Sequence, residues 1–223
     1  MAQLTWDNTG ERFYEIGVDH GVLYLPDNTT GAYTKGFAWN GLTSVSEAPS
    51  GAEPSPQYAD NIKYLNLVSV EEFGGTIEAF TYPEQFGVCD GSVSPVKGLH
   101  VGQQLRSTFG LSYRTRIGND LVGDTLAYKL HLVYGALAAP TEKQYQTVND
   151  SPEAMTLSWE FTTTPVPAPG MRPTSLLAID SRTVDATKLK TLEGILYGAS
   201  SAEPKLPLPA EVFSTLGVTS TSA

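Results

Sequence analysis

The sequence predicts a mainly β protein built around an antiparallel sheet with one face on a core. Of the 223 residues, 40% are hydrophobic and only 17% are charged, and the chain holds 21 glycines and 15 prolines. Such a composition favours strands and turns over helices. Three long segments also alternate apolar and polar side chains, as strands with one buried face do. A chain of this length can bury a core of its own.

Short elements are expected before the long strands. Residues 21–25 and 33–39 have the composition of strands between polar turns. Residues 62–73 and 75–82 are two strand-like segments around a Gly-Gly pair, which predicts a hairpin between them. A short helix should begin at Pro83, because proline is favoured in the first turn of a helix.

The three alternating segments are the clearest signal. Each one places its large apolar side chains on a single face. In residues 105–117 these are Phe109, Leu111, Tyr113, Thr115 and Ile117. In residues 125–135 they are Tyr128, Leu130, Leu132 and Tyr134, and in residues 155–163 they are Met155, Leu157, Trp159 and Phe161. We expect all three in one antiparallel sheet.

A helix is predicted near the C-terminus, after a last strand at 175–180. Asp185 is a suitable N-cap and Gly198 a suitable stop, with an apolar stripe between them. Residues 199–223 are broken by prolines and end rich in Ser and Thr. We therefore expect a single domain over residues 1–198 and an extended C-terminal arm over 199–223.

A proline-rich stretch interrupts the first half of the chain and predicts a long loop at 44–60. Pro49, Pro54 and Pro56 each fix φ and remove a backbone donor, which disfavours a helix or a central strand. Prolines also restrict the unbound loop, so ordering it against a partner costs less entropy. We interpret these prolines and Tyr58 as part of an assembly loop that contacts neighbouring subunits.

The charge balance bears on possible partners. Twenty-four acidic and 14 basic residues give a net charge of −10, the wrong sign for a duplex DNA or anionic membrane binder. Glu71, Glu72 and Glu78 concentrate negative charge in one predicted hairpin. They are either solvated or form a wall that repels anions.

Basic residues occur on two of the long strands. Arg114 and Arg116 lie on the first, and Lys129 and His131 on the second, so the hairpin could carry one basic patch. Either the patch is solvated and pairs with acids such as Glu160, or it meets an acidic surface of another copy. The sequence leaves both interpretations open.

Enzyme chemistry finds little support in the sequence. Cys89 has no flanking motif of a catalytic nucleophile, and a lone cysteine is usually a small buried hydrophobe. No spacing of His, Cys or carboxylates predicts a metal, and no phosphate-binding glycine loop occurs. No signal peptide or membrane-spanning segment is recognised. We expect a soluble protein without catalytic activity or cofactor.

Four blocks of sequence, in this order and spacing, carry a resemblance to a known family. The blocks are WNGLTSVSEAPSGAEPSPQYADNIKY, EEFGGTIEAFTYPEQFGVCDG, FGLSYRTRIGND and YKLHLVYGALAAPTEKQYQTVND. With these blocks the chain resembles the major tail protein of long-tailed, non-contractile bacteriophages, especially those of actinobacterial and other Gram-positive hosts. The likeness extends from about Trp39 to Gly198.

The resemblance implies a tail-tube fold, an antiparallel β-sandwich or barrel flanked by a short helix, and a structural role in the virion. Such subunits form homohexameric rings, which stack around a tape-measure protein between tail initiator and terminator proteins. The resulting channel lets DNA pass without specific binding, and assembly takes place in the host cytoplasm. By position, residues 49–58 would be a loop between subunits. Our hypothesis is that Glu71, Glu72 and Glu78 include residues that face the lumen. The alternative is a monomeric β-sandwich module that binds glycans or decorates a capsid or tail, with Tyr58, Tyr64 and Tyr82 as its aromatic platform.

Overall fold

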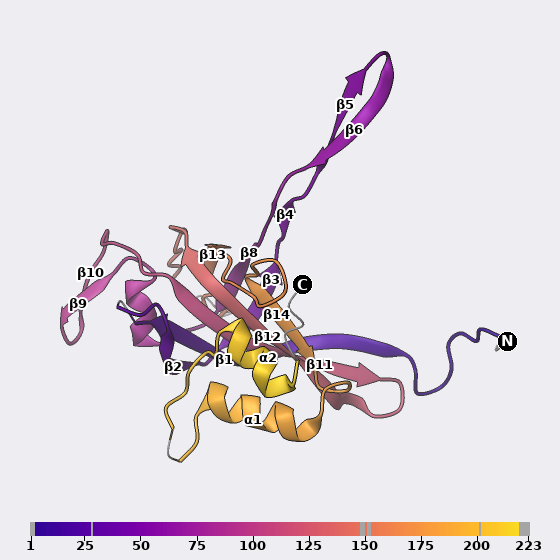
Figure 1. The fold of residues 1–223 in the computed structure, drawn as a ribbon. Coiled ribbons are helices and arrows are strands. Elements are labelled where there is room, and N and C mark those ends of the chain that lie inside the picture. The colour runs from indigo at the N-terminus through magenta and orange to yellow at the C-terminus, as the bar shows by residue number, and fades with distance from the viewer. Residues whose placement is uncertain (1–2, 28, 148–149, 151–152, 201, 219–223) are drawn as a thin grey trace.

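A computed structural model describes residues 3–27, 29–147, 150, 153–200 and 202–218 (Figure 1). Its main sheet is antiparallel with the strand order β2-β1-β11-β12-β13-β8-β3, and β14 also pairs with β12. The predicted mainly β, antiparallel fold is confirmed. The strands of this sheet are β1 (Phe13–Pro26), β2 (Tyr33–Trp39), β3 (Leu42–Glu47), β8 (Gly74–Ala79), β11 (Phe109–Asn119), β12 (Gly123–Ala138), β13 (Leu157–Thr163) and β14 (Leu176–Asp180).

The sheet becomes a sandwich because one edge of β12 is shared by two strands. Lys129–Val133 pairs with β14, whereas Ala136–Ala138 pairs with β13. Gly135 lies between the two pairings with φ 61, and a Cβ there would be 2.3 Å from the Thr164 carbonyl oxygen. Only glycine fits such a close approach at positive φ. The branch β13-β8-β3 can therefore leave the plane and fold over β1, β2 and β11.

The first core lies between these two parts of the sheet and is rich in aromatic side chains. Trp159 and Phe86 are fully buried, with ring centroids 5.2 Å apart, and Trp39 packs 4.6 Å from Phe86. Phe86 belongs to a short 3-10 helix, η1 (Glu84–Val88), which begins directly after Pro83. The helix predicted there is confirmed. The core also contains Leu23, Ile77, Phe109, Leu111, Tyr113, Val133 and Phe161.

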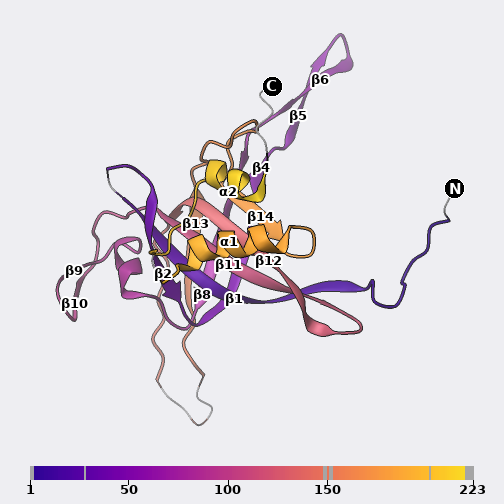
Figure 2. The ribbon, with the colours of Figure 1, turned by 60° about the horizontal axis from the view of Figure 1, so that its bottom comes forward.

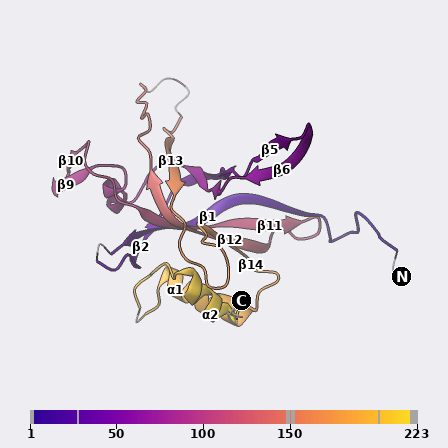
Figure 3. The same cartoon turned by 45° about the horizontal axis from the view of Figure 1, so that its top comes forward.

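Two helices cover the opposite face of β12 (Figures 2 and 3). They are α1 (Ala186–Tyr197) and α2 (Pro209–Leu216). Asp185 caps α1 by accepting hydrogen bonds from the Thr187 and Lys188 amides, both at 3.0 Å, so the helix predicted there is confirmed. A second core forms between the helices and the sheet, from side chains that include Leu130, Leu132, Tyr134, Leu189, Leu192 and Leu196.

The segment after α1 is not the extended arm that we predicted. Leu206 and Val212 are 2% and 1% exposed and belong to the second core. The Leu206 amide donates to the Tyr33 carbonyl at 3.2 Å, and the Tyr134 hydroxyl donates to the Pro207 carbonyl at 2.9 Å. Residues 202–218 thus continue the domain beyond the predicted boundary at 198. The end of the predicted arm, 219–223, lies outside the described residues.

The predicted loop at 44–60 is wrong, because most of it is β-structure. After β3, the chain forms β4 (Ser50–Gly51) and β5 (Pro54–Ala59), then returns as β6 (Ile62–Val68) and β7 (Glu71–Glu72). Asp60 and Asn61 form the turn with φ 51 and 63, as a type I′ hairpin turn requires.

The hairpin predicted between residues 62–73 and 75–82 is wrong for the same reason. Strand β6 pairs with β5, whereas β8 pairs with β3 and β13. Another small hairpin, β9 (Val93–Val96) with β10 (Leu99–Val101), extends from the body elsewhere.

Candidate assembly surfaces

The most prominent surface feature is the hairpin of residues 50–72, which we call the hairpin arm. It projects well away from the sandwich (Figure 1), and all of its residues are exposed. Pro54 and Pro56 lie on β5, and Pro49 directly precedes the arm. These prolines are tolerated because β5 pairs only with β6 and its other edge is free.

Both faces of the hairpin arm carry large apolar side chains. Residues that pair directly across the two strands share a face, and successive residues alternate. The register shifts at Tyr64, so Ile62 shares one face with Leu65 and Leu67, whereas Val68 lies on the other face together with Tyr58 of β5. Tyr58, opposite Lys63, is 71% exposed. A two-stranded ribbon with no core of its own and so much exposed apolar surface is typical of an interaction element.

The root of the hairpin arm is fixed to the sandwich by Glu47, at the end of β3. Its Oε1 accepts a hydrogen bond from the Tyr113 hydroxyl at 2.6 Å and lies 2.9 Å from His131 Nδ1. The His131 ring stacks on Tyr113 with centroids 4.6 Å apart, and its Nε2 lies 3.0 Å from Thr115 Oγ1. The hydrogen bond with His131 and then that with Tyr113 hold the pKa of Glu47 below its usual value despite burial. This cluster ties β3 to β11 and β12 and sets the direction in which the arm leaves the body.

The three acidic candidates do not share one hairpin. Glu71 and Glu72 pair with Gly51 and Ser50 at the base of the hairpin arm. Glu78 lies on the outer side of β8, where its carboxylate accepts from Ser44 Oγ at 2.8 Å. Whether they face a lumen stays a prediction.

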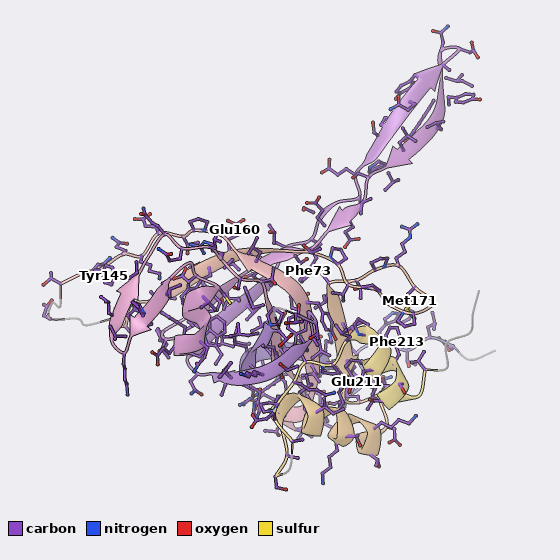
Figure 4. All side chains as sticks on the ribbon, turned by 60° about the vertical axis from the view of Figure 1, so that its left-hand side comes forward. Phe73, Tyr145, Glu160, Met171, Glu211 and Phe213 are labelled. Atoms are coloured by element: carbon purple, nitrogen blue, oxygen red, sulfur yellow. The ribbon has the colours of Figure 1, made fainter. Side chains whose placement is uncertain are left out.

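Glu78 belongs to a polar sheet surface that we call the polar face. The inward side chains of β3, β8 and β13 enter the first core, so their alternate residues point outward. Figure 4 shows Glu160 on this outer side of β13, away from Glu211 and Phe213 on α2. The outward residues are Ser44, Ser46, Thr76, Glu78, Ser158, Glu160 and Thr162. Both charged members of this set are acidic.

The predicted single basic patch is wrong, because its four members lie on opposite faces. In the register of β11 and β12, Arg114 pairs with Leu130 and Arg116 with Tyr128. Both arginines thus share the face that the helices cover. Lys129 and His131 pair with Thr115 and Tyr113 on the other face.

All four basic side chains have acidic partners within the subunit, but Glu160, the partner that we had suggested, is not among these acids. Arg114 and Arg116 each donate to Asp19 at 3.0 Å, and Arg116 also donates to Asp124 at 3.1 Å. Burial raises the pKa of Asp19, but the hydrogen bonds from the two arginines outweigh it and hold that pKa below its usual value. Lys129 pairs with Glu15, and His131 with Glu47. A role of these residues between subunits stays a prediction.

A second arm, residues 3–12, was not predicted from the sequence; we call it the N-terminal arm. The Gly10 amide donates to Asp120 Oδ1 at 3.0 Å, and Asn119 Nδ2 donates to the Gly10 carbonyl at 3.0 Å. These bonds hold the arm against the turn between β11 and β12. Beyond that anchor Leu4 and Trp6 are 73% and 77% exposed. The available signal was a tryptophan within an otherwise polar segment.

The residue that we considered as a catalytic nucleophile lies in the interior of the domain, away from these surfaces. Cys89 is fully buried in the first core, where burial, and then the charge of Asp90, raises the pKa of its thiol to about 12. Within the described ranges, no group of three or more His, Cys, Asp or Glu side chains is placed to hold a metal ion. None of the helices in those ranges has the length and apolar character needed to cross a membrane.

Comparisons with known proteins give a likeness to solved structures. No family model matches the sequence, and no curated protein matches it. Among solved structures, the chain is similar to one in the cryo-EM structure of the anti-feeding prophage (AFP) baseplate, 6-fold symmetrised. The two chains share 12% identity with a TM-score of 0.38, over 79% of this chain and 97% of the other. At these values the likeness carries no inference about function.

Proposed function

We propose that this protein is a structural subunit of a phage tail tube, which polymerises as stacked hexameric rings to form a channel for genome delivery. The observation that carries the proposal is the hairpin arm. Its exposed apolar residues lie on both faces of a ribbon that reaches far beyond the sandwich. A surface of that kind is stabilised by burial between other subunits rather than by its own fold.

The polar face supports the channel part of the proposal. Its outward side chains carry hydroxyls and carboxylates, with Glu78 and Glu160 as the charged members. Each phosphate contact by a cation adds affinity for DNA. A wall that offers hydroxyls and carboxylates instead lets DNA slide without being held. In this arrangement the polar face lines the lumen, and Glu71 and Glu72 lie at the root of the hairpin arm.

The remaining partners follow from this role. A tape-measure protein would occupy the lumen before DNA does, and initiator and terminator proteins would bind the two ends of the tube. The protein would be assembled in the host cytoplasm and reside in the virion, with no catalytic function. These statements rest on the resemblance of the sequence to tail proteins.

The glycan-binding alternative has less support. Its platform required Tyr58, Tyr64 and Tyr82 on one surface. Tyr82 instead packs edge-on against Trp159 in the body, with ring centroids 5.3 Å apart. Tyr58 and Tyr64 lie on the projecting hairpin arm.

An armless variant tests the proposal. Residues 50–72 are replaced by Asn-Gly, so that a two-residue turn joins Pro49 to Phe73. Ser50 and Glu72 are already paired across the arm, and Ala48 N donates to the Gly74 carbonyl at 2.8 Å. A type I′ turn therefore continues the existing ladder.

We expect the armless variant to keep the thermal midpoint of the wild type, with a far-UV circular dichroism spectrum that lacks only the contribution of the removed strands. In negative-stain microscopy of concentrated samples, the wild type should form rings or tubes and the variant should not. Normal tubes from the armless variant would contradict the role of the arm. A wild type that stays monomeric in concentrated samples, and also when tail initiator proteins are added, would contradict the proposed function itself.

A further inference from the structure

The hairpin arm consists of two β-pairs that are separated by an unpaired joint. Near the body β4 pairs with β7, and farther out β5 pairs with β6 (Figure 1). Residues 52–53 and 69–70 lie between these pairs and belong to neither. We call these four residues the arm joint, and residues 54–68 the outer ribbon. Every residue of the arm joint is exposed.

The interruption results from backbone conformation and not from a change of register. Two residues separate the β-pairs on each strand, and both pairs share one register. A continuous ladder would therefore pair Ala52 with Val70. The next pair along it would be Glu53 with Ser69. The ladder is broken because Gly51 and Ala52 have φ of 80 and 54, whereas a strand requires negative φ.

The conformation of Ala52 is costly and has little to hold it. A residue with a Cβ rarely adopts positive φ, and such strain persists only where the surroundings impose it. Within the described part of the chain, no backbone hydrogen bond of a turn or loop involves the arm joint, and its side chains are exposed. The open form of the joint therefore has a close competitor, the paired form, in which Ala52 leaves positive φ.

We propose that the arm joint is a two-state switch, open in the free subunit and paired when the hairpin arm is buried against a second copy of the chain. The inference rests on the proposed assembly through the arm and adds a step that controls it. In the open form the unpaired N–H and C=O groups of the joint are exposed to water. Burial removes that water, so these groups need partners within the protein. The paired form supplies them, and burial of the arm therefore selects it.

Pairing also completes one apolar face of the hairpin arm. Val70 is 83% exposed in the open form. In the continuous register it lies on the same face as Val68 and Tyr58, because alternate residues of a strand share a face. That face then extends without interruption from the joint towards the turn of the arm. A partner consequently meets a longer apolar surface on the paired form than on the open form.

The motion is confined to the joint, because the base of the arm is fixed to the body. Glu47 is held by the cluster described above, and the Ala48 amide donates to the Gly74 carbonyl at 2.8 Å. The outer ribbon therefore moves as a lever on a fixed base. Seven residues separate Val70 from Lys63, a distance of about 23 Å, so a turn of about 30° at the joint displaces Lys63 by roughly 12 Å.

Distances between two spin labels test for the two forms. Lys63→Cys on the outer ribbon and Thr125→Cys on β12 are labelled in one full-length chain, while the buried Cys89, with a thiol pKa of about 12, stays unlabelled. We expect two distance populations in the free subunit. When labelled chains are assembled with an excess of unlabelled chains, the minor population should become the major one. The control pair Ser50→Cys and Thr125→Cys, which lies below the joint, should give one distance that assembly does not change.

Substitutions at Ala52 should move the equilibrium in opposite directions. Ala52→Gly removes the cost of positive φ and stabilises the open form, whereas the β-branched side chain of Ala52→Val favours a strand and stabilises the paired form. The cost of a left-handed residue corresponds to a change of roughly 5–30-fold in the ratio of the two forms for Ala52→Gly. Assembly from a minor form requires correspondingly more protein, so Ala52→Gly should raise the concentration needed for half-maximal assembly by up to that factor, and Ala52→Val should lower it. Ala59→Gly and Ala59→Val make the same exchanges at a residue that is already paired with Ile62, and they should leave both distance populations unchanged.

The outcomes separate this inference from the proposed function. Tubes whose subunits show one Lys63–Thr125 distance, unchanged by assembly and by both Ala52 variants, would overturn the switch and leave the tube function standing. Two populations that shift in opposite directions in the Ala52 variants, without rings or tubes even when initiator proteins are added, would support the two-state joint and contradict the tube. One unchanged distance and no assembly would contradict both.

Discussion

Leu206→Ala measures how far the C-terminal segment belongs to the folded core. The side chain is 2% exposed, and its Cδ2 would lie 2.5 Å from a Cβ added at Gly110. One methyl group thus packs directly on the backbone of β11, beside the Tyr33 ring. Large-to-small changes at such sites cost about 2–5 kcal/mol. Because Gly110 has no side chain that could enter the cavity, we expect a loss of about 3 kcal/mol.

The assay is urea unfolding of dilute protein, followed by circular dichroism. With a slope of about 2 kcal/mol per molar urea, the midpoint should fall by about 1.5 M with the slope unchanged. Leu105→Ala is the matched control, since it removes the same atoms from a side chain that is 95% exposed. It should change the free energy of unfolding by less than about 0.5 kcal/mol. Equal midpoints for the two variants would refute the packing of residues 202–218 and restore the predicted extended arm.

Two further predictions concern titratable groups. The folded pKa of Glu47 is lowered, so its contribution to stability is present above the usual carboxyl range and lost as pH falls through the folded pKa. Between about pH 6 and pH 3 the wild type should therefore lose more free energy of unfolding than Glu47→Gln, as urea titrations at both pH values would show. Cys89, with a thiol pKa of about 12, should not react with a thiol reagent in the native state at about pH 8. Rapid labelling of the native protein would contradict its burial, whereas labelling only in denaturant would confirm it.

The strands of the body were predictable because each obeys one period over many residues. Phe109, Leu111 and Tyr113 enter the first core and Leu130, Leu132 and Tyr134 the second, as their alternation requires. The helix at Ala186–Tyr197 was equally predictable, because the residues that cap its start and end it are local sequence signals. Local patterns thus identified the elements and their buried faces.

The pairing of segments that are distant in the sequence was harder to predict. The hairpin arm has no core, so neither of its strands shows a polar face against an apolar one, and its prolines suggested a loop. Asp60–Asn61 was the local clue, because adjacent residues of that type favour a type I′ turn. The burial of Leu206 depends on Tyr33 and Gly110, which are far away in the sequence.

The predicted basic patch failed for a reason that matters for assembly. Each strand was assumed to have one buried face, but β12 is buried on both, by the other half of the sandwich and by the helices. The polar residues of β11 and β12 consequently lie on opposite sides of the sheet.

Because the helices of the same chain cover the second face, that face does not need a neighbouring subunit for its stability. The surfaces left for partners are then the polar face and the two arms. Folding and assembly should accordingly respond to different residues. Leu206→Ala should lower the free energy of unfolding of the isolated subunit, and Trp6→Ala should leave it unchanged while it raises the concentration required for assembly. A Trp6→Ala subunit that unfolds more easily would show that the N-terminal arm stabilises its own chain. Folding and assembly would then depend on the same residue.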